Sequence, residues 1–195
     1  MATYIEDEKI RKIKTLINDA EKVLVLGIGE VNMGDDGFGP YVTVELHKKS
    51  LSNEKVLFMN GKTNYHDRKD EIVAFGPDLI LVVDTCASGD EPGTFIVADE
   101  AKMVDWVPIS SHVIPIQVYL EMLRQDLPDM KAHLLGVNPV AMEGQIQRKP
   151  YMPDKYTIDD YDADPDLPFY EINLTPEIRE VGDELIEILI EVLEV

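Results

Sequence analysis

The stretch from Val23 to Pro40 constrains the fold more than any other part of the chain. It opens with four consecutive apolar residues that run into a glycine, a pattern typical of a strand buried on both faces of a parallel sheet. Three glycines, Gly27, Gly29 and Gly34, then give the backbone the freedom to form a loop. In open α/β sheets, ligands bind at the loops that follow the carboxyl ends of strands. The stretch therefore predicts an α/β fold with a functional loop after its first strand.

Two carboxylates, Asp35 and Asp36, lie in this loop, directly before a predicted helix over 37–48. The glycines are similar to a dinucleotide-binding fingerprint, but Asn32 replaces the third glycine. The second strand also ends at Asn60 instead of the acidic residue that binds a ribose. Two aspartates would repel a pyrophosphate, because unit charges a few ångströms apart interact by about 1–4 kcal/mol. The loop therefore disfavours a nucleotide and favours a cation.

A second apolar run, 79–83, predicts another buried strand, and it ends directly at Asp84. Because parallel strands have their carboxyl ends at one edge of a sheet, we expect Asp84 to lie level with Asp36. Asp84 alone is equally compatible with a cap on the following turn, and its shared edge with Asp36 favours a site. His112 lies in the loop that enters a predicted helix over 115–125, where its ring could face the same edge. By itself, His112 is also compatible with an ordinary loop residue.

Apolar patterns elsewhere complete a single α/β domain of 195 residues. They predict further strands over 55–59, 94–98 and 134–137, helices over 6–20 and 70–75, and a last helix that begins at Pro176. The strand at 94–98 is expected to be an antiparallel edge, and Thr175 is expected to be the N-cap of the last helix. The predicted fold is a three-layer sandwich, a twisted and mostly parallel five-stranded sheet with helices on both faces.

Composition limits the partners and the compartment. Asp and Glu number 38 against 18 Lys and Arg, and the net charge of −20 disfavours nucleic acid and anionic lipid. This charge fits either a solvated surface or a surface for a basic partner segment. The single cysteine, Cys86, excludes an internal disulfide and suits a reducing compartment. No stretch reaches the roughly 18 apolar residues of a membrane span, and the first ten residues lack an apolar signal core, so we expect a cytoplasmic protein.

Four separated segments match one protein family, in the family's order, over about residues 22–193. The segments are Gly27–Gly29 continuing through Gly34–Pro40, Val83–Asp84 with Glu91–Thr94, Ser111–His112, and Leu174–Glu177. Each segment alone is a weak signal, but the ordered set is specific. The chain resembles the [NiFe]-hydrogenase maturation endopeptidases, and within them the type that processes hydrogenase-3-like and F420-reducing large subunits.

The resemblance implies an endopeptidase that removes the C-terminal extension of a hydrogenase large-subunit precursor after nickel insertion. On the family's motif, Asp36, Asp84 and His112 would bind the nickel, which arrives inside the precursor, and Asp36 and Asp84 would be the catalytic carboxylates. No organic cofactor is implied, and we expect a monomer. Either nickel activates the scissile carbonyl or a water, or it only positions the bond while Asp36 or Asp84 acts as general base. A non-catalytic nickel-dependent chaperone or scaffold would carry the same three residues.

The chain departs from the family pattern in two places. Glu30 stands where the family commonly has Asn, either as an added ligand or, as we prefer, pointing to solvent. The segment 138–172 is longer than usual and lacks a periodic apolar pattern. Its aromatic residues and its many aspartates predict a partly ordered flap that contacts the large subunit.

Overall fold

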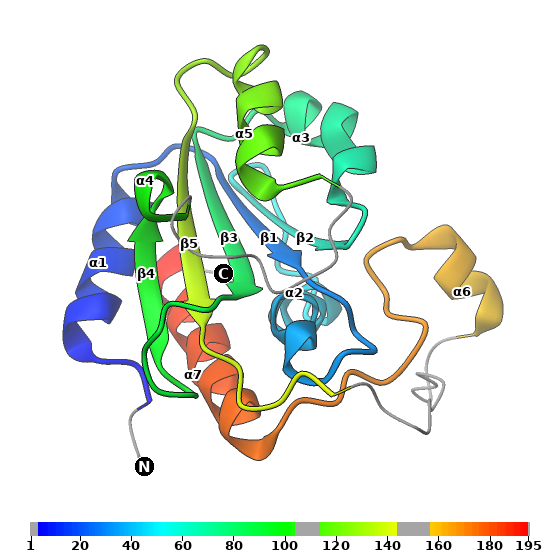
Figure 1. Cartoon of the computed structure of the whole chain (residues 1–195). Coiled ribbons are helices and arrows are strands. Elements are labelled where there is room, and N and C mark those ends of the chain that lie inside the picture. The colour runs from blue at the N-terminus through cyan, green and yellow to red at the C-terminus, as the bar shows by residue number, and fades with distance from the viewer. Residues whose placement is uncertain (1–3, 104–113, 144–156, 195) are drawn as a thin grey trace.

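The computed structural model describes residues 4–103, 114–143 and 157–194. A five-stranded sheet with the order β2-β1-β3-β5-β4 forms its centre (Figure 1). The strands are β1 (Val23–Ile28), β2 (Val56–Lys62), β3 (Leu79–Thr85), β4 (Phe95–Asp99) and β5 (Lys131–Val137). Four strands are parallel and only β4, at one edge, pairs antiparallel with its neighbour β5. The predicted single-domain, mostly parallel sheet is therefore confirmed, including its antiparallel edge.

Helices cover both faces of the sheet, as a three-layer sandwich requires (Figure 1). One face carries α1 (Asp7–Asn18), α2 (Phe38–Lys48) and α7 (Pro176–Leu193). The other carries α3 (Lys69–Phe75), α4 (Glu100–Met103) and α5 (Ile116–Arg124). Because side chains alternate along a strand, Val25 of β1 packs under α2 and α7, whereas Leu24 and Leu26 pack under α3 and α5.

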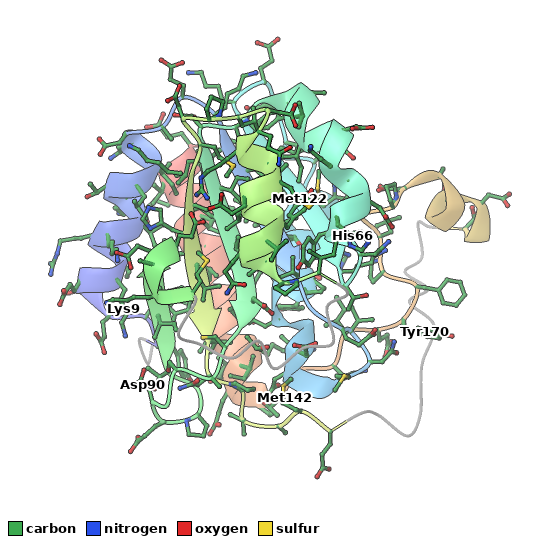
Figure 2. All side chains as sticks on the ribbon, turned by 45° about the horizontal axis from the view of Figure 1, so that its top comes forward. Lys9, His66, Asp90, Met122, Met142 and Tyr170 are labelled. Carbon is green, nitrogen blue, oxygen red and sulfur yellow. The ribbon has the colours of Figure 1, made fainter. Side chains whose placement is uncertain are left out.

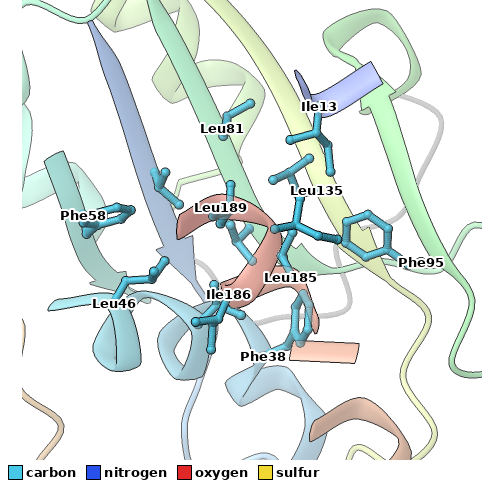
Figure 3. Packing of buried hydrophobic residues seen from close by; sticks show 14 of the residues in the cluster. Ile13, Phe38, Leu46, Phe58, Leu81, Phe95, Leu135, Leu185, Ile186 and Leu189 are labelled. Atoms are coloured by element: carbon cyan, nitrogen blue, oxygen red, sulfur yellow. The ribbon is translucent and has the colours of Figure 1, made fainter. Parts of the chain in front are cut away.

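The larger apolar cluster lies between the sheet and α7 (Figure 3). Leu185, Ile186 and Leu189 of α7 belong to this cluster together with Phe38 of α2 and Phe58 of β2, and all five side chains are buried. Burying one such side chain contributes roughly 1.5–3 kcal/mol. The last helix therefore fixes α2, and with it the loop between β1 and α2.

Two glycines allow α2 to begin directly on the backbones of the sheet. A Cβ atom added to Gly39 would lie 2.1 Å from the carbonyl oxygen of Val83, and one added to Gly27 would lie 2.2 Å from that of Gly39. Side chains at these positions would push the helix away from β1 and β3. Close approach, rather than loop freedom, therefore explains Gly27, whereas Gly29, at a φ of 138°, supplies the freedom expected of it.

Three elements differ from the sequence-based expectation. Strand β2 continues to Lys62 instead of ending at 59, and β5 begins at Lys131 instead of 134, because pairing with neighbouring strands extends each one beyond its apolar run. The short helix α6 (Ile158–Ala163) was not predicted; a capping box formed by Thr157 and Asp160 begins it. Among the described helices, none combines the length and the apolar character that crossing a membrane requires.

Candidate functional site

The loops that follow β1, β3 and β5 meet at one end of the sheet. Figure 2 shows Asp90 and Met142 on two of these loops, at the lower end of the molecule. The loop after β1 contains a 3₁₀ turn, η1 (Gly34–Gly37), which runs directly into α2. This turn holds both Asp35 and Asp36, and neither carboxylate is exposed.

Both carboxylate oxygens of Asp36 accept a hydrogen bond. Its Oδ1 accepts a hydrogen bond of 3.0 Å from the Thr85 hydroxyl, and its Oδ2 accepts one of 2.7 Å from the backbone N–H of Glu30. The residue also lies at the start of α2, where the partial positive charge of a helix N-terminus favours a carboxylate by about 0.3–1 kcal/mol. These donors allow a negative charge to be buried there.

Asp84 lies near the carboxyl end of β3 and is 7% exposed. Its Oδ1 accepts a 2.8 Å hydrogen bond from the backbone N–H of Thr85, the kind of local contact that the turn-cap interpretation anticipated. Thr85 therefore contacts Asp84 through its N–H and Asp36 through its hydroxyl. Two of the three predicted site residues, Asp36 and Asp84, are therefore hydrogen-bonded to the same residue.

His112, the third predicted site residue, lies outside the described residues. Two residues later, the carbonyl of Ile114 accepts a hydrogen bond from the hydroxyl of Tyr65 in η2 (Tyr65–Arg68). Burial raises the pKa of Tyr65, and the negative charge of Asp84 raises it further, so the phenol is within electrostatic reach of that carboxylate. Tyr65 therefore fixes the entry to α5 on the Asp84 side. The sequence analysis did not single out Tyr65.

Asp35 has a different environment from its neighbour Asp36. Its carboxylate accepts four hydrogen bonds, from the backbone N–H groups of Val140, Ala141 and Thr175 and from the Thr175 hydroxyl, at 2.7–3.1 Å. Asp35 therefore joins η1 to the segment after β5 and to the start of α7. Thr175 is the N-cap residue of α7, as predicted, but its side chain makes no cap hydrogen bond and its hydroxyl donates to Asp35 instead.

Asn138, which the sequence did not single out, organises the loop after β3. Its side chain binds the backbone N–H of Ser88 at 3.0 Å, the Ser88 hydroxyl at 2.9 Å and the carbonyl of Asp90 at 2.9 Å. Its backbone binds Thr94 and Gly93, at 3.0 and 2.8 Å. One buried amide therefore determines the shape of the 88–94 loop. An asparagine directly after a predicted strand was the available signal.

Neither Cys86 nor Ser88 is suited to act as a nucleophile. Burial, and then the charges of Asp84 and Asp90, raise the pKa of the Cys86 thiol to about 12, so the reactive thiolate is scarce near neutral pH. The Ser88 hydroxyl donates to Asp90 and accepts from Asn138, at 2.7 and 2.9 Å. Neither of these two contacts of the Ser88 hydroxyl is with a histidine that could activate it.

The carboxylate of Glu30 is engaged within its own loop. Its Oε1 accepts hydrogen bonds from the backbone and the side-chain nitrogen of Asn32, at 3.0 and 2.7 Å. The residue is half-buried, so its side chain neither extends freely into solvent nor makes a described contact with Asp36. What Glu30 gives the site is its backbone N–H, the donor to Asp36.

A second set of potential metal ligands lies on the far side of α2, where ligand atoms of His47, Asp164 and Asp166 come within 4.8 Å of one another. These groups already bind protein. His47 Nε2 lies 2.7 Å from Asp164, and Asp166 accepts from both nitrogens of the Arg68 guanidinium at 3.1 Å and from the backbone of Asn60 at 2.7 Å. The set attaches the segment after α6 to the outer strand β2, and the Arg68 charge disfavours a cation there.

The geometry at the end of β1 and β3 suits a divalent cation. Asp36 and Asp84 are oxygen ligands of the kind that bind such ions, and an imidazole supplied by the segment before α5 would add a nitrogen. Either carboxylate could also take a proton from a water, because both lie in a site with little access to solvent. The arrangement therefore fits hydrolysis near a bound ion.

Comparison with protein families supports a hydrolytic role. The family model HycI, described as hydrogenase maturation protease, matches residues 40–155, which include Asp84 and His112 and begin just after Asp36. A protein of Methanocaldococcus jannaschii, named as a candidate hydrogenase maturation protease, is 22% identical over 184 residues, or 91% of this chain and 92% of its own length. The Rhizobium leguminosarum bv. viciae hydrogenase expression/formation protein HupD is 30% identical over 93 residues, 43% of this chain and 41% of HupD.

Solved structures share the fold. The [NiFe] hydrogenase maturation protease HycI from Thermococcus kodakarensis superposes with a TM-score of 0.70 at 23% identity, covering 94% of this chain and 99% of that protein. The Escherichia coli endopeptidase HycI gives a TM-score of 0.60 at 19% identity, covering 85% and 87%. Because the family model spans more than half of the sequence and this fold accommodates it, the chain belongs to the hydrogenase maturation protease family.

Proposed function

We propose that the protein removes the C-terminal extension of a nickel–iron hydrogenase large-subunit precursor, and that it recognises the nickel already inserted in that precursor. Asp36, Asp84 and His112 would bind the ion in positions that the precursor leaves open. The proposal extends the family's peptidase activity to a particular substrate and to a particular means of recognition.

The observation that carries the proposal is the shared contact of Asp36 and Asp84 with Thr85. Two carboxylates that accept hydrogen bonds from one residue repel each other, and the repulsion grows when solvent is excluded. A precursor that carries a nickel cation would relieve this repulsion, whereas a nickel-free precursor would not. Each 1.4 kcal/mol of relieved repulsion corresponds to about tenfold in affinity.

The contact between Tyr65 and Ile114 supports His112 as the third ligand. The Ile114 carbonyl binds a phenol that is within the electrostatic influence of Asp84, and His112 precedes Ile114 by only two residues. Two residues of extended chain span at most about 7 Å, so an imidazole at position 112 is within reach of the same end of the sheet. A neutral imidazole is a common ligand of nickel and zinc.

Two mechanisms, which differ in the roles of the ion and of the carboxylates, are compatible with this site. Nickel can supply Lewis-acid chemistry, by polarising the scissile carbonyl or by lowering the pKa of a water. Alternatively, Asp36 or Asp84 takes the proton of the attacking water while the ion positions the bond. In both cases the hydrogen bonds to Asp36 and Asp84 orient the carboxylates before the precursor arrives.

We also assign the precursor-contacting flap to part of the segment 138–172. Its described C-terminal part is anchored to the body of the protein, because Asp166 and Leu167 are buried and Lys62 Nζ donates to the carbonyls of Pro165 and Leu167. Phe169 follows this anchor and is 59% exposed. An aromatic side chain presented to solvent from an anchored segment is suited to contact a partner protein.

Mass spectrometry of the precursor tests the proposed function. The purified protein is incubated with nickel-loaded and with nickel-free large-subunit precursor, and the mass of each is followed with time. We expect the loaded precursor alone to lose the mass of its C-terminal extension. Binding of the loaded precursor without any loss of mass would identify a chaperone or scaffold instead. Equal cleavage of both precursors would refute recognition through nickel.

A further inference from the structure

Thr85 donates to both carboxylates of the candidate site. It is the last residue of β3 and is 3% exposed. Its backbone N–H donates to Asp84 Oδ1 at 2.8 Å, and its hydroxyl donates to Asp36 Oδ1 at 3.0 Å. The two acceptors come from different elements: Asp84 is in β3 itself, and Asp36 is in η1, 49 residues from Thr85. Thr85 therefore links the Asp36 carboxylate to the Asp84 carboxylate through two hydrogen bonds.

The sheet holds Thr85 more rigidly than a loop would hold it. Thr85 is in register with Val137 of β5, and the next residue, Cys86, donates its N–H to the Val137 carbonyl at 3.0 Å. The threonine is also β-branched, which restricts its χ1 rotation. The hydroxyl therefore has a nearly fixed position relative to Asp84 on the same strand.

Asp36, by contrast, lies outside the sheet, in the 3₁₀ turn η1 of the loop after β1. Gly29 and Gly34 both have positive φ, at 138° and 58°. The Glu30 N–H, which donates to Asp36 Oδ2, belongs to this same loop. The Thr85 hydroxyl joins Asp36 Oδ1 to a strand of the sheet.

We propose that Thr85 is a positioning residue that orients Asp36 and Asp84 together toward one ion. This inference rests on the function proposed above. Residues that hydrogen-bond to metal ligands typically change metal affinity or activity by about 10–100-fold when they are replaced. Loss of the Thr85 hydroxyl would leave the fold and both carboxyl groups present and would remove one hydrogen bond that orients Asp36 relative to β3.

Three variants separate this role from a general effect on stability. Thr85→Val removes the hydroxyl and keeps the β-branched shape that suits a strand. Thr85→Ser keeps the hydroxyl and removes a methyl group. Thr43→Val is the matched control, because Thr43 is equally buried and its hydroxyl donates to the Gly39 carbonyl at 2.9 Å, within α2.

The measurements are the dissociation constant of each variant for nickel-loaded precursor, the kcat for its cleavage, and the nickel absorption spectrum of the complex. We expect Thr85→Val to raise the dissociation constant or lower kcat by about 10-fold or more and to alter the spectrum. We expect Thr85→Ser and Thr43→Val to stay within about twofold of the wild type.

Three results would overturn the assignment: wild-type behaviour of Thr85→Val, equal impairment of Thr85→Ser and Thr85→Val, or equal impairment of Thr43→Val. Each of these leaves the proposed function intact if the wild type still prefers the nickel-loaded precursor. A wild type that binds and cleaves loaded and nickel-free precursor equally contradicts the proposed function itself, and the role of Thr85 toward an ion falls with it.

Discussion

Replacement of Asp35 by asparagine is expected to destabilise the protein without removing a group that touches the proposed ion. Asp35 is fully buried and both of its oxygens accept backbone N–H groups: Oδ1 from Thr175, and Oδ2 from Val140 and Ala141. Asparagine has only one oxygen. Its amide nitrogen must therefore face at least one of these N–H donors, which leaves that donor without an acceptor.

The size of the effect follows from these contacts. The less costly orientation keeps the oxygen toward Val140 and Ala141 and loses the bond to the Thr175 N–H. A hydrogen bond to a charged group contributes about 1.5–3 kcal/mol, and an unsatisfied buried donor costs about 1–3 kcal/mol. Both figures describe the loss of the same hydrogen bond and are therefore not added in full. We expect Asp35→Asn to lower the free energy of unfolding by about 2–4 kcal/mol. For a chain of this size that corresponds to roughly 5–15 °C in Tm.

Asp36→Asn is the matched control, because it makes the same change one residue later. Its amide oxygen can keep the Glu30 N–H while its amide nitrogen donates to the Thr85 hydroxyl, which can also accept. We therefore expect a change in unfolding free energy of only about 1 kcal/mol or less, together with loss of precursor cleavage. Urea denaturation and differential scanning calorimetry measure the stabilities, and the precursor assay measures cleavage. A larger loss of stability in Asp36→Asn than in Asp35→Asn would refute the division of roles between the two residues.

Three further outcomes are expected. Tyr65→Phe removes the hydroxyl that holds Ile114, so precursor cleavage should fall about 10-fold while unfolding free energy falls by only about 0.5–1.5 kcal/mol; unchanged cleavage would contradict the role of this contact. Asn138→Ala should speed amide hydrogen exchange within 88–94 and leave the central strands protected, and exchange that rises everywhere would indicate a different role. The raised pKa of about 12 keeps the buried Cys86 thiol protonated. At pH 8 this thiol should therefore react with iodoacetamide more than about a thousandfold slower in the native protein than after unfolding. Rapid labelling of the native protein would contradict this.

The sheet was predictable because its central strands are buried on both faces. Uninterrupted apolar runs occur in Val23–Ile28 and Leu79–Thr85. Such runs fit the central strands of a parallel sheet, where helices cover both faces. The placement of Asp36 and Asp84 at one end followed from the same rule, since Asp84 lies at the carboxyl end of β3 and Asp36 lies in the loop that follows β1. The sequence did not predict that both carboxylates bind Thr85, because this depends on the Thr85 hydroxyl and on the close packing of α2 against the sheet.

Contacts between distant segments were the part that local patterns missed. Asp35 and Asp36 are the same residue type in adjacent positions, and only partners 105–140 residues away distinguish the structural one from the candidate ligand. Thr175 has the sequence of an N-cap, yet its hydroxyl binds Asp35, since a buried carboxylate competes for the same donor. The segment after α6 has no apolar period because it is attached mainly by polar groups, such as Asp166 with Arg68.

X-ray absorption at the nickel edge tests most directly the claim that this protein binds the nickel of its substrate. The nickel-loaded precursor is measured alone and in complex with the wild type, with Asp84→Asn and with His112→Ala. We predict that the wild type adds oxygen or nitrogen ligands at about 2.0–2.2 Å and that each variant lacks part of this addition. A nickel coordination shell that stays the same in the wild-type complex, while the precursor is cleaved, would contradict the account.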